Sequence, residues 1–139
     1  MKTYQTSINI NASSDTVWRV LTHTMPNDPT PFGILKLQGQ IALGAKIKLW
    51  SEVAPERAFT LKVVAFDPPN KMIWRGGMPF GLFTGTRTFT LTSSSTSTQF
   101  HMSEVFSGSL SGMITKFMPD LTSSFEKFAQ ALKSASETS

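Results

Sequence analysis

The sequence contains no cysteine among its 139 residues and only two histidines. The missing cysteine excludes disulfides, thiol nucleophiles and thiolate metal ligands together. Neither His23 nor His101 lies at a ligand spacing from a second histidine or a carboxylate. The chain also lacks a G-x-S-x-G nucleophile motif, a G-x-G-x-x-G loop and a Walker loop. We therefore expect no metal site and no cofactor.

Long apolar runs and clustered charges are missing too. No apolar stretch approaches the length that spans a bilayer, and the N-terminal residues MKTYQTSINI lack the apolar core of a signal peptide. The net charge is +4, but the basic residues are scattered and are not interleaved with aromatic ones, which argues against a nucleic-acid partner. We expect one cytoplasmic domain over residues 1–139, a monomer or homodimer without stable membrane anchoring.

Large apolar residues are present in excess, with eleven phenylalanines and seven methionines against one tyrosine. A stripe of them recurs near the C-terminus at helical spacing: Ile114, Phe117, Met118, Leu121, Phe125, Phe128, Ala129 and Leu132. This spacing predicts one apolar face of a long helix. Pro119 interrupts the pattern, so either the main helix begins there or one helix from about Leu110 bends there.

Most of the chain before this stripe is predicted to form strands. The alternation of apolar and polar residues predicts strands at 3–10, 34–37, 45–53, 58–66, 71–75, 86–92 and 98–106. One short helix, capped by Ser13 or Ser14, is expected to end near His23. Three prolines between residues 25 and 32 argue against regular structure there. The whole predicts an α+β fold in which a curved antiparallel sheet wraps around the long C-terminal helix.

The glycine-rich apolar segment from residue 76 to 85 has two interpretations. It is either a bulged strand at a corner of the sheet or a flexible lip at the mouth of a cavity. Trp74 shares a face with Met72 and would line such a cavity if that face is the inner one. Trp18 lies with Val17 and Leu21 on the first helix, where a core position competes with a pocket position.

The last predicted hairpin has a register that the sequence defines. Centring its polar loop between Ser95 and Thr96 pairs Leu91 with Phe100, Phe89 with Met102, and Arg87 with Glu104. All six side chains share one face, because strand side chains alternate. Four of the six are apolar, so Arg87 and Glu104 are predicted to lie opposite each other on the inner face. The pair is either a structural salt bridge, a polar anchor for a ligand, or a site where Glu104 acts as acid or base.

Three stretches resemble the START-like superfamily, also called polyketide cyclase/dehydrase and lipid transport (SRPBCC), which includes birch-pollen-allergen-like proteins. They are residues 10–18 (INASSDTVW), 64–74 (VAFDPPNKMIW) and 104–108 (EVFSG). The first looks like that family's start of the first helix, although Ser13 stands where a proline is frequent. The resemblance implies a helix-grip fold with an internal hydrophobic pocket. Members bind lipids, sterols, polyketides or plant hormones, and some catalyse aromatic ring cyclisation.

The expected function is the binding of a small hydrophobic ligand, of lipid, polyketide or aromatic type, between the sheet and the C-terminal helix. The residues predicted to bind it are Arg87, Glu104, Trp74, Phe80, Phe83, Phe89, Leu91, Phe100, Met102, Phe117, Leu121 and Phe125. Two alternatives remain open. One is a cyclase- or aromatase-like enzyme in which Glu104 is the candidate catalytic residue. The other is a non-catalytic protein that contacts a partner through Met78–Phe83.

Overall fold

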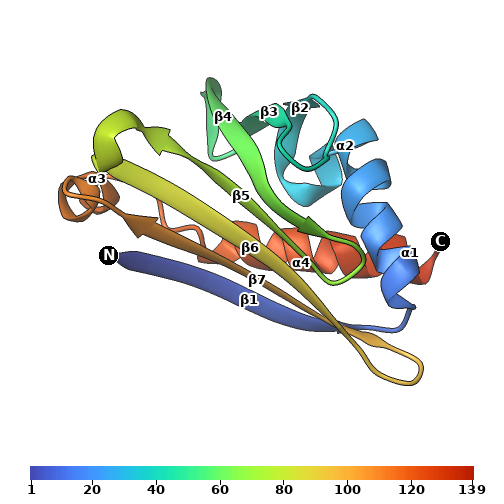
Figure 1. The fold of residues 1–139 in the computed structure, drawn as a ribbon. Helices are drawn as coiled ribbons and strands as arrows, with labels where there is room; N and C mark the ends of the chain where they lie inside the picture. The colour runs from blue at the N-terminus through green and yellow to red at the C-terminus, as the bar shows by residue number, and fades with distance from the viewer.

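The computed structural model describes residues 1–139 as one antiparallel sheet curled around a C-terminal helix (Figure 1). The seven strands lie in the order β1-β7-β6-β5-β4-β3-β2. Their bounds are β1 Lys2–Ile10, β2 Ile34–Gln38, β3 Lys46–Ser51, β4 Ala54–Asp67, β5 Lys71–Met78, β6 Phe83–Ser93 and β7 Thr98–Ser107. The long helix α4 (Thr122–Glu137) packs across the inner face of the sheet. The predicted α+β helix-grip architecture is confirmed.

Helical segments join the strands. Between β1 and β2 lie α1 (Ser14–Arg19), the π-helical turn η1 (Val20–Thr24), α2 (Met25–Asn27) and the 3₁₀ turn η2 (Thr30–Phe32). The 3₁₀ turn η3 (Pro79–Gly81) joins β5 to β6, and α3 (Ser111–Lys116) follows β7. Ser13 caps α1, because its hydroxyl accepts a hydrogen bond from the Thr16 N–H at 3.2 Å.

The hairpin of β6 and β7 has the predicted register. Leu91 pairs with Phe100, Phe89 with Met102, and Arg87 with Glu104. The four apolar members of these pairs are buried, with exposed fractions between 0% and 4%. The match between pairing and burial confirms that this face of the hairpin is the inner one.

The core lies between this inner face and one side of α4. Phe128, on that side of the helix, is 2% exposed and packs against three other aromatic rings. Its ring centroid lies 5.3 Å from that of Phe32, 6.0 Å from Phe89 and 6.2 Å from Phe100. Aromatic contacts of this kind add to the burial of a large apolar surface. Phe128 therefore joins the sheet, α4 and the segment before β2.

The proline-rich segment differs from the prediction. Residues 25–32 were expected to lack regular structure, yet they include α2 and η2. Pro31 lies in the first turn of η2, where the missing N–H needs no intrahelical acceptor and the fixed φ of proline suits the helix. Pro26 lies within the continuous helical run 14–27, directly after the π-helical turn η1. The predicted exclusion was therefore wrong.

The C-terminal stripe is also not one continuous helix face. α3 ends at Lys116 and α4 begins at Thr122. Pro119 lies in the break between the two helices, so it neither begins the main helix nor bends a continuous one. Residues in the break do not continue the helical spacing of α4. Phe117 therefore does not lie on the buried face of the helix and is 85% exposed.

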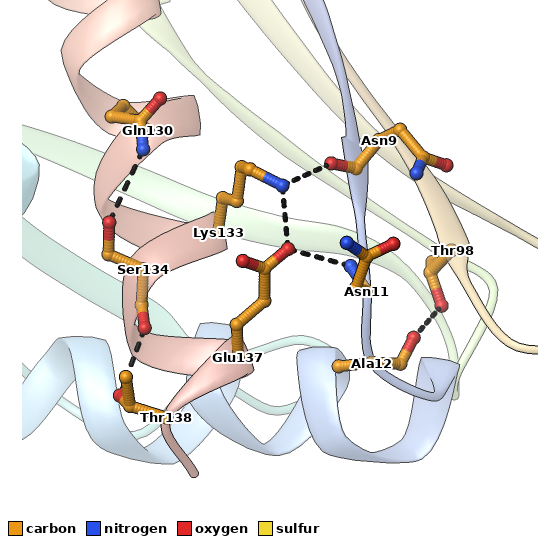
Figure 2. Close-up of polar contacts among 9 residues, drawn as sticks. All are labelled: Asn9, Asn11, Ala12, Thr98, Gln130, Lys133, Ser134, Glu137 and Thr138. Atoms are coloured by element: carbon orange, nitrogen blue, oxygen red, sulfur yellow. Dashed lines mark hydrogen bonds and ion pairs between the residues drawn. The ribbon is translucent and has the colours of Figure 1, made fainter.

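The C-terminal end of α4 is attached to the edge strand β1 by polar contacts (Figure 2). The Lys133 ammonium donates to the Asn9 carbonyl oxygen at 3.0 Å and to the Glu137 carboxylate at 2.6 Å. The same Glu137 carboxylate accepts a hydrogen bond from the Asn11 backbone N–H at 2.8 Å. These bonds lower the pKa of Glu137, because Lys133 and Asn11 both favour the ionised carboxylate. The end of α4 is therefore held to the sheet.

Candidate functional site

The most unusual feature of the inner face is an ion pair between β6 and β7. The Arg87 Nε donates to Glu104 Oε1 at 2.6 Å, and the two side chains are 22% and 14% exposed. The guanidinium also lies over the Phe125 ring of α4, at 4.9 Å from its centroid. A part-buried charge needs such partners, since desolvation opposes its ionised form. Arg87 is thus held between the sheet and the helix.

Polar side chains continue on both sides of this pair in one row across the sheet. Trp74 on β5 pairs with Arg87, and Tyr4 on β1 pairs with Glu104. Trp74 is 1% exposed, and its indole Nε1 is buried without a hydrogen-bond partner. Only the Nε of Arg87 donates to a protein acceptor, although a guanidinium has five N–H donors. The row therefore holds unused hydrogen-bond donors on an otherwise apolar face.

A cavity of about 60 Å³ lies beside Arg87, between the sheet and the N-terminal half of α4. It is lined by Phe32, Gly33, Ile34, Leu49, Ser51, Val53, Arg87, Met102, Leu121, Ser124, Phe125 and Phe128. Pockets for small molecules usually measure about 300–1,000 Å³. The space seen here has room for a few water molecules. A larger guest requires the cavity to widen.

Four of the predicted residues line this cavity, namely Arg87, Met102, Leu121 and Phe125. Glu104 stands next to it through its bond to Arg87. A second group is packed into the core and does not reach the cavity: Trp74, Phe89, Leu91 and Phe100. The structure therefore brings part of the predicted set together.

The remaining predicted residues, Phe83, Phe80 and Phe117, do not line this cavity. Phe83 is half-buried and stacks on Phe106, with ring centroids 5.6 Å apart. Phe80 is 95% exposed in η3, and Phe117 is 85% exposed in the break before α4. The segment Met78–Phe83 forms the turn between β5 and β6 and contributes no residue to the cavity. It is therefore not the lip of this cavity.

Several lining residues were not predicted. They are Phe32, Gly33, Ile34, Leu49, Ser51, Val53, Ser124 and Phe128. The alternation of Leu49, Ser51 and Val53 along one predicted strand is a signal that could have indicated part of this wall. Phe128 belongs to the C-terminal stripe. No sequence pattern distinguishes Phe32 or Gly33, because they lie at and just after the end of the proline-rich segment that the fold brings under α4.

An ion pair lies at the edge of the cavity. The Lys127 ammonium on α4 donates to both carboxylate oxygens of Glu52, at 3.0 and 2.9 Å, and Glu52 lies between two lining residues of the β3–β4 turn. Both side chains are well exposed, at 46% and 37%. The pair therefore contributes little to stability.

The N-terminal end of α4 lacks a side-chain cap at Leu121. Asp120 instead accepts a hydrogen bond from the Thr122 N–H at 2.9 Å, and the bonds to Thr122 lower the pKa of the Asp120 carboxyl.

No helix of this structure has the length and apolar character that a membrane span requires.

Solved structures with the same fold include three that this chain matches along nearly its whole length. Protein MLL2253 from Mesorhizobium loti is 17% identical, with a TM-score of 0.76 over 99% of this chain and 98% of that one. The Aha1 dimer from Colwellia psychrerythraea is 18% identical (TM-score 0.74, 99% and 97%). The ZhuI aromatase/cyclase from Streptomyces sp. R1128 is 14% identical (0.74, 98% and 93%). At these identities the likeness shows the fold alone.

No curated protein matches the sequence. The profile of the family described as polyketide cyclase / dehydrase and lipid transport matches residues 1–137. Because this match covers almost the whole chain, the protein belongs to the polyketide cyclase/dehydrase and lipid transport family.

Proposed function

We propose that the protein binds a small, mostly apolar molecule in the cavity between the sheet and α4. The observation that carries this proposal is Arg87, which lines a mostly apolar cavity and has hydrogen-bond donors to spare. Such a site favours a ligand with an apolar body and one acceptor group, such as a carbonyl or carboxylate oxygen. Membership in a family named for polyketide cyclases and lipid transport agrees with an apolar ligand.

The cavity widens in this proposal by movement of the N-terminal end of α4. That end begins after a break in the helix, and its Leu121 and Phe125 line the cavity. The C-terminal end is fixed to β1 by Lys133 and Glu137 (Figure 2). Segments with few buried contacts open at the lowest cost in free energy. The break before the helix, residues 117–121, is therefore the proposed hinge, and the first turn of α4 is the proposed moving part.

The bound ligand leaves the ion pair intact. Glu104 holds the Nε of Arg87, while the terminal nitrogens of the guanidinium donate to the ligand. In this arrangement Glu104 positions Arg87 rather than transferring a proton, and the proposal is one of binding and not of turnover.

The proposal is tested with 2-naphthoate, which has an apolar body and a carboxylate, against 2-methylnaphthalene, which lacks the acceptor. Calorimetric titration should show that naphthoate binds more tightly than 2-methylnaphthalene. In Arg87→Met the ratio of the two affinities should fall by about tenfold or more. Ser124→Leu should fill the cavity and abolish binding of both compounds. Ser123→Leu is the matched control, because Ser123 is exposed on the same helix and does not line the cavity.

The melting temperature of each variant shows whether it is folded. The proposal fails if the folded wild-type protein binds neither compound, or if Ser124→Leu and Ser123→Leu bind equally well. Equal affinity for the two compounds would contradict the role given to Arg87.

A further inference from the structure

Two phenylalanines stand almost fully exposed at one end of the sheet, outside the cavity. Phe80, in η3, is 95% exposed, and Phe117, after α3, is 85% exposed. Met78 and Met113 beside them are 43% and 56% exposed. We call these four residues the apolar tip. The β5–β6 turn and α3 lie at the same end in Figure 1, and the Leu110 N–H donates to the Leu82 carbonyl oxygen at 2.8 Å.

The backbone at Phe80 shows that turn stability does not account for this residue. Its φ is +62°, the only positive φ of a non-glycine residue in the chain. This left-handed conformation disfavours a bulky side chain and suits glycine or asparagine. A turn optimised for stability would hold one of those residues here. The sequence instead places a large apolar side chain where it costs stability and buries nothing.

The charges around the apolar tip are mostly positive. Lys116 ends α3, and Lys2 and Arg75 lie on the strands that reach this end. Asp120 is the carboxylate nearby, and Lys2 contributes to lowering its pKa. Three cations against one carboxylate favour an anionic partner surface.

The exposed apolar area is too small for a stable contact between two copies of the chain. The four side chains together expose on the order of 500 Å², taking about 200 Å² for a large side chain. A stable protein interface buries about 800 Å² on each partner. Separate aromatic side chains on two loops, flanked by lysines, instead suit insertion below lipid headgroups.

We propose that the apolar tip docks the protein reversibly on an anionic lipid surface, with Phe80 and Phe117 inserted and Lys2 and Lys116 near the headgroups. The inference goes beyond the proposed ligand binding and does not depend on it, because the tip residues do not line the cavity. A lipid surface is also where a sparingly soluble apolar molecule is taken up or released. Docking of this kind requires no membrane-spanning segment.

The test is co-sedimentation with vesicles of phosphatidylcholine containing phosphatidylserine, compared with vesicles of phosphatidylcholine alone. Wild type should bind the anionic vesicles more tightly, and added salt should weaken this binding. Phe80→Asn should reduce vesicle affinity at least tenfold, while its thermal stability stays equal to or above that of wild type. Lys116→Gln should cost about fivefold on anionic vesicles only. Leu43→Ser is the matched control, since Leu43 is 67% exposed in the β2–β3 loop.

Fluorescence provides a second measurement that does not depend on lost affinity. A Phe80→Trp variant should shift its emission to the blue on anionic vesicles, and a Leu43→Trp variant should not. No vesicle binding by the folded wild type would overturn the proposal. So would a dimer in sedimentation velocity that Phe80→Asn dissociates, because the tip would then be an interface between copies of the chain.

Discussion

Removing one partner of the Arg87–Glu104 pair should destabilise the fold far more than removing both. Arg87→Met leaves a carboxylate that is 14% exposed without its partner at 2.6 Å, and it removes the guanidinium from the Phe125 ring. The unpaired charge and the lost contact should cost about 2–3 kcal/mol. For a chain of 139 residues this corresponds to a fall of about 6–10 °C in melting temperature.

The double variant Arg87→Met with Glu104→Leu removes both charges and keeps side chains of similar size. It should lie within about 1 kcal/mol of wild type, because two well-packed apolar residues replace the pair without an unpaired charge. The stability of Glu104→Leu alone should lie between that of Arg87→Met and that of the double variant. The unpaired Arg87 is 22% exposed and retains contact with water. Chemical denaturation of the four proteins gives the coupling free energy, expected to be at least about 2 kcal/mol.

The exposed pair of Glu52 and Lys127 is the control for this cycle. Its side chains are 37% and 46% exposed, so the same cycle there should give a coupling of less than about 1 kcal/mol. An unchanged stability of Arg87→Met would contradict a stabilising ion pair, and so would a double variant at Arg87 and Glu104 that loses the sum of the two single effects.

Two other predictions follow from the same packing and charges. Phe128→Ala should cost about 3–5 kcal/mol in denaturant unfolding, because it empties the centre of the aromatic core, whereas Phe117→Ala should change stability by less than about 0.5 kcal/mol. Similar losses in the two variants would contradict the placement of α4. Glu137→Gln should lower the stability of the fold at pH 7 and make that stability less dependent on pH in acid. A carboxylate whose pKa is lowered in the folded state stabilises the fold at pH values above its ordinary pKa of 4.5. It loses that contribution as the pH falls through the pKa of the folded state. Parallel acid unfolding curves for Glu137→Gln and wild type would show that the hydrogen bonds of Glu137 to Lys133 and Asn11 are not formed.

The register of the last hairpin could be predicted because the polar loop gives the centre of the turn and the alternation of Phe89, Leu91, Phe100 and Met102 excludes a one-residue shift. A shift by one residue would have placed Phe89 and Phe100 on opposite faces of the sheet. The same pairing brought Arg87 and Glu104 together correctly. Local patterns therefore define the strands and the pairing of this hairpin well, whereas the neighbours of the ion pair on β5 and β1 come from the structure.

The cavity wall could be predicted only in part, because its residues come from segments far apart in the chain. Phe32 and Gly33 reach the cavity only after the proline-rich segment folds under α4. Phe117 was misplaced because helical spacing continues through Pro119 in the sequence, although the helix itself does not. Periodicity describes one element at a time and does not show where an element breaks.

Native mass spectrometry of the purified protein, followed by organic extraction, is the most direct test of a ligand site beside Arg87. We expect a molecule bound in a one-to-one ratio, with an apolar body and an acceptor oxygen, which 2-naphthoate displaces and Ser124→Leu excludes. A protein that carries no such molecule, and forms no complex when 2-naphthoate is added, would contradict a ligand site beside Arg87.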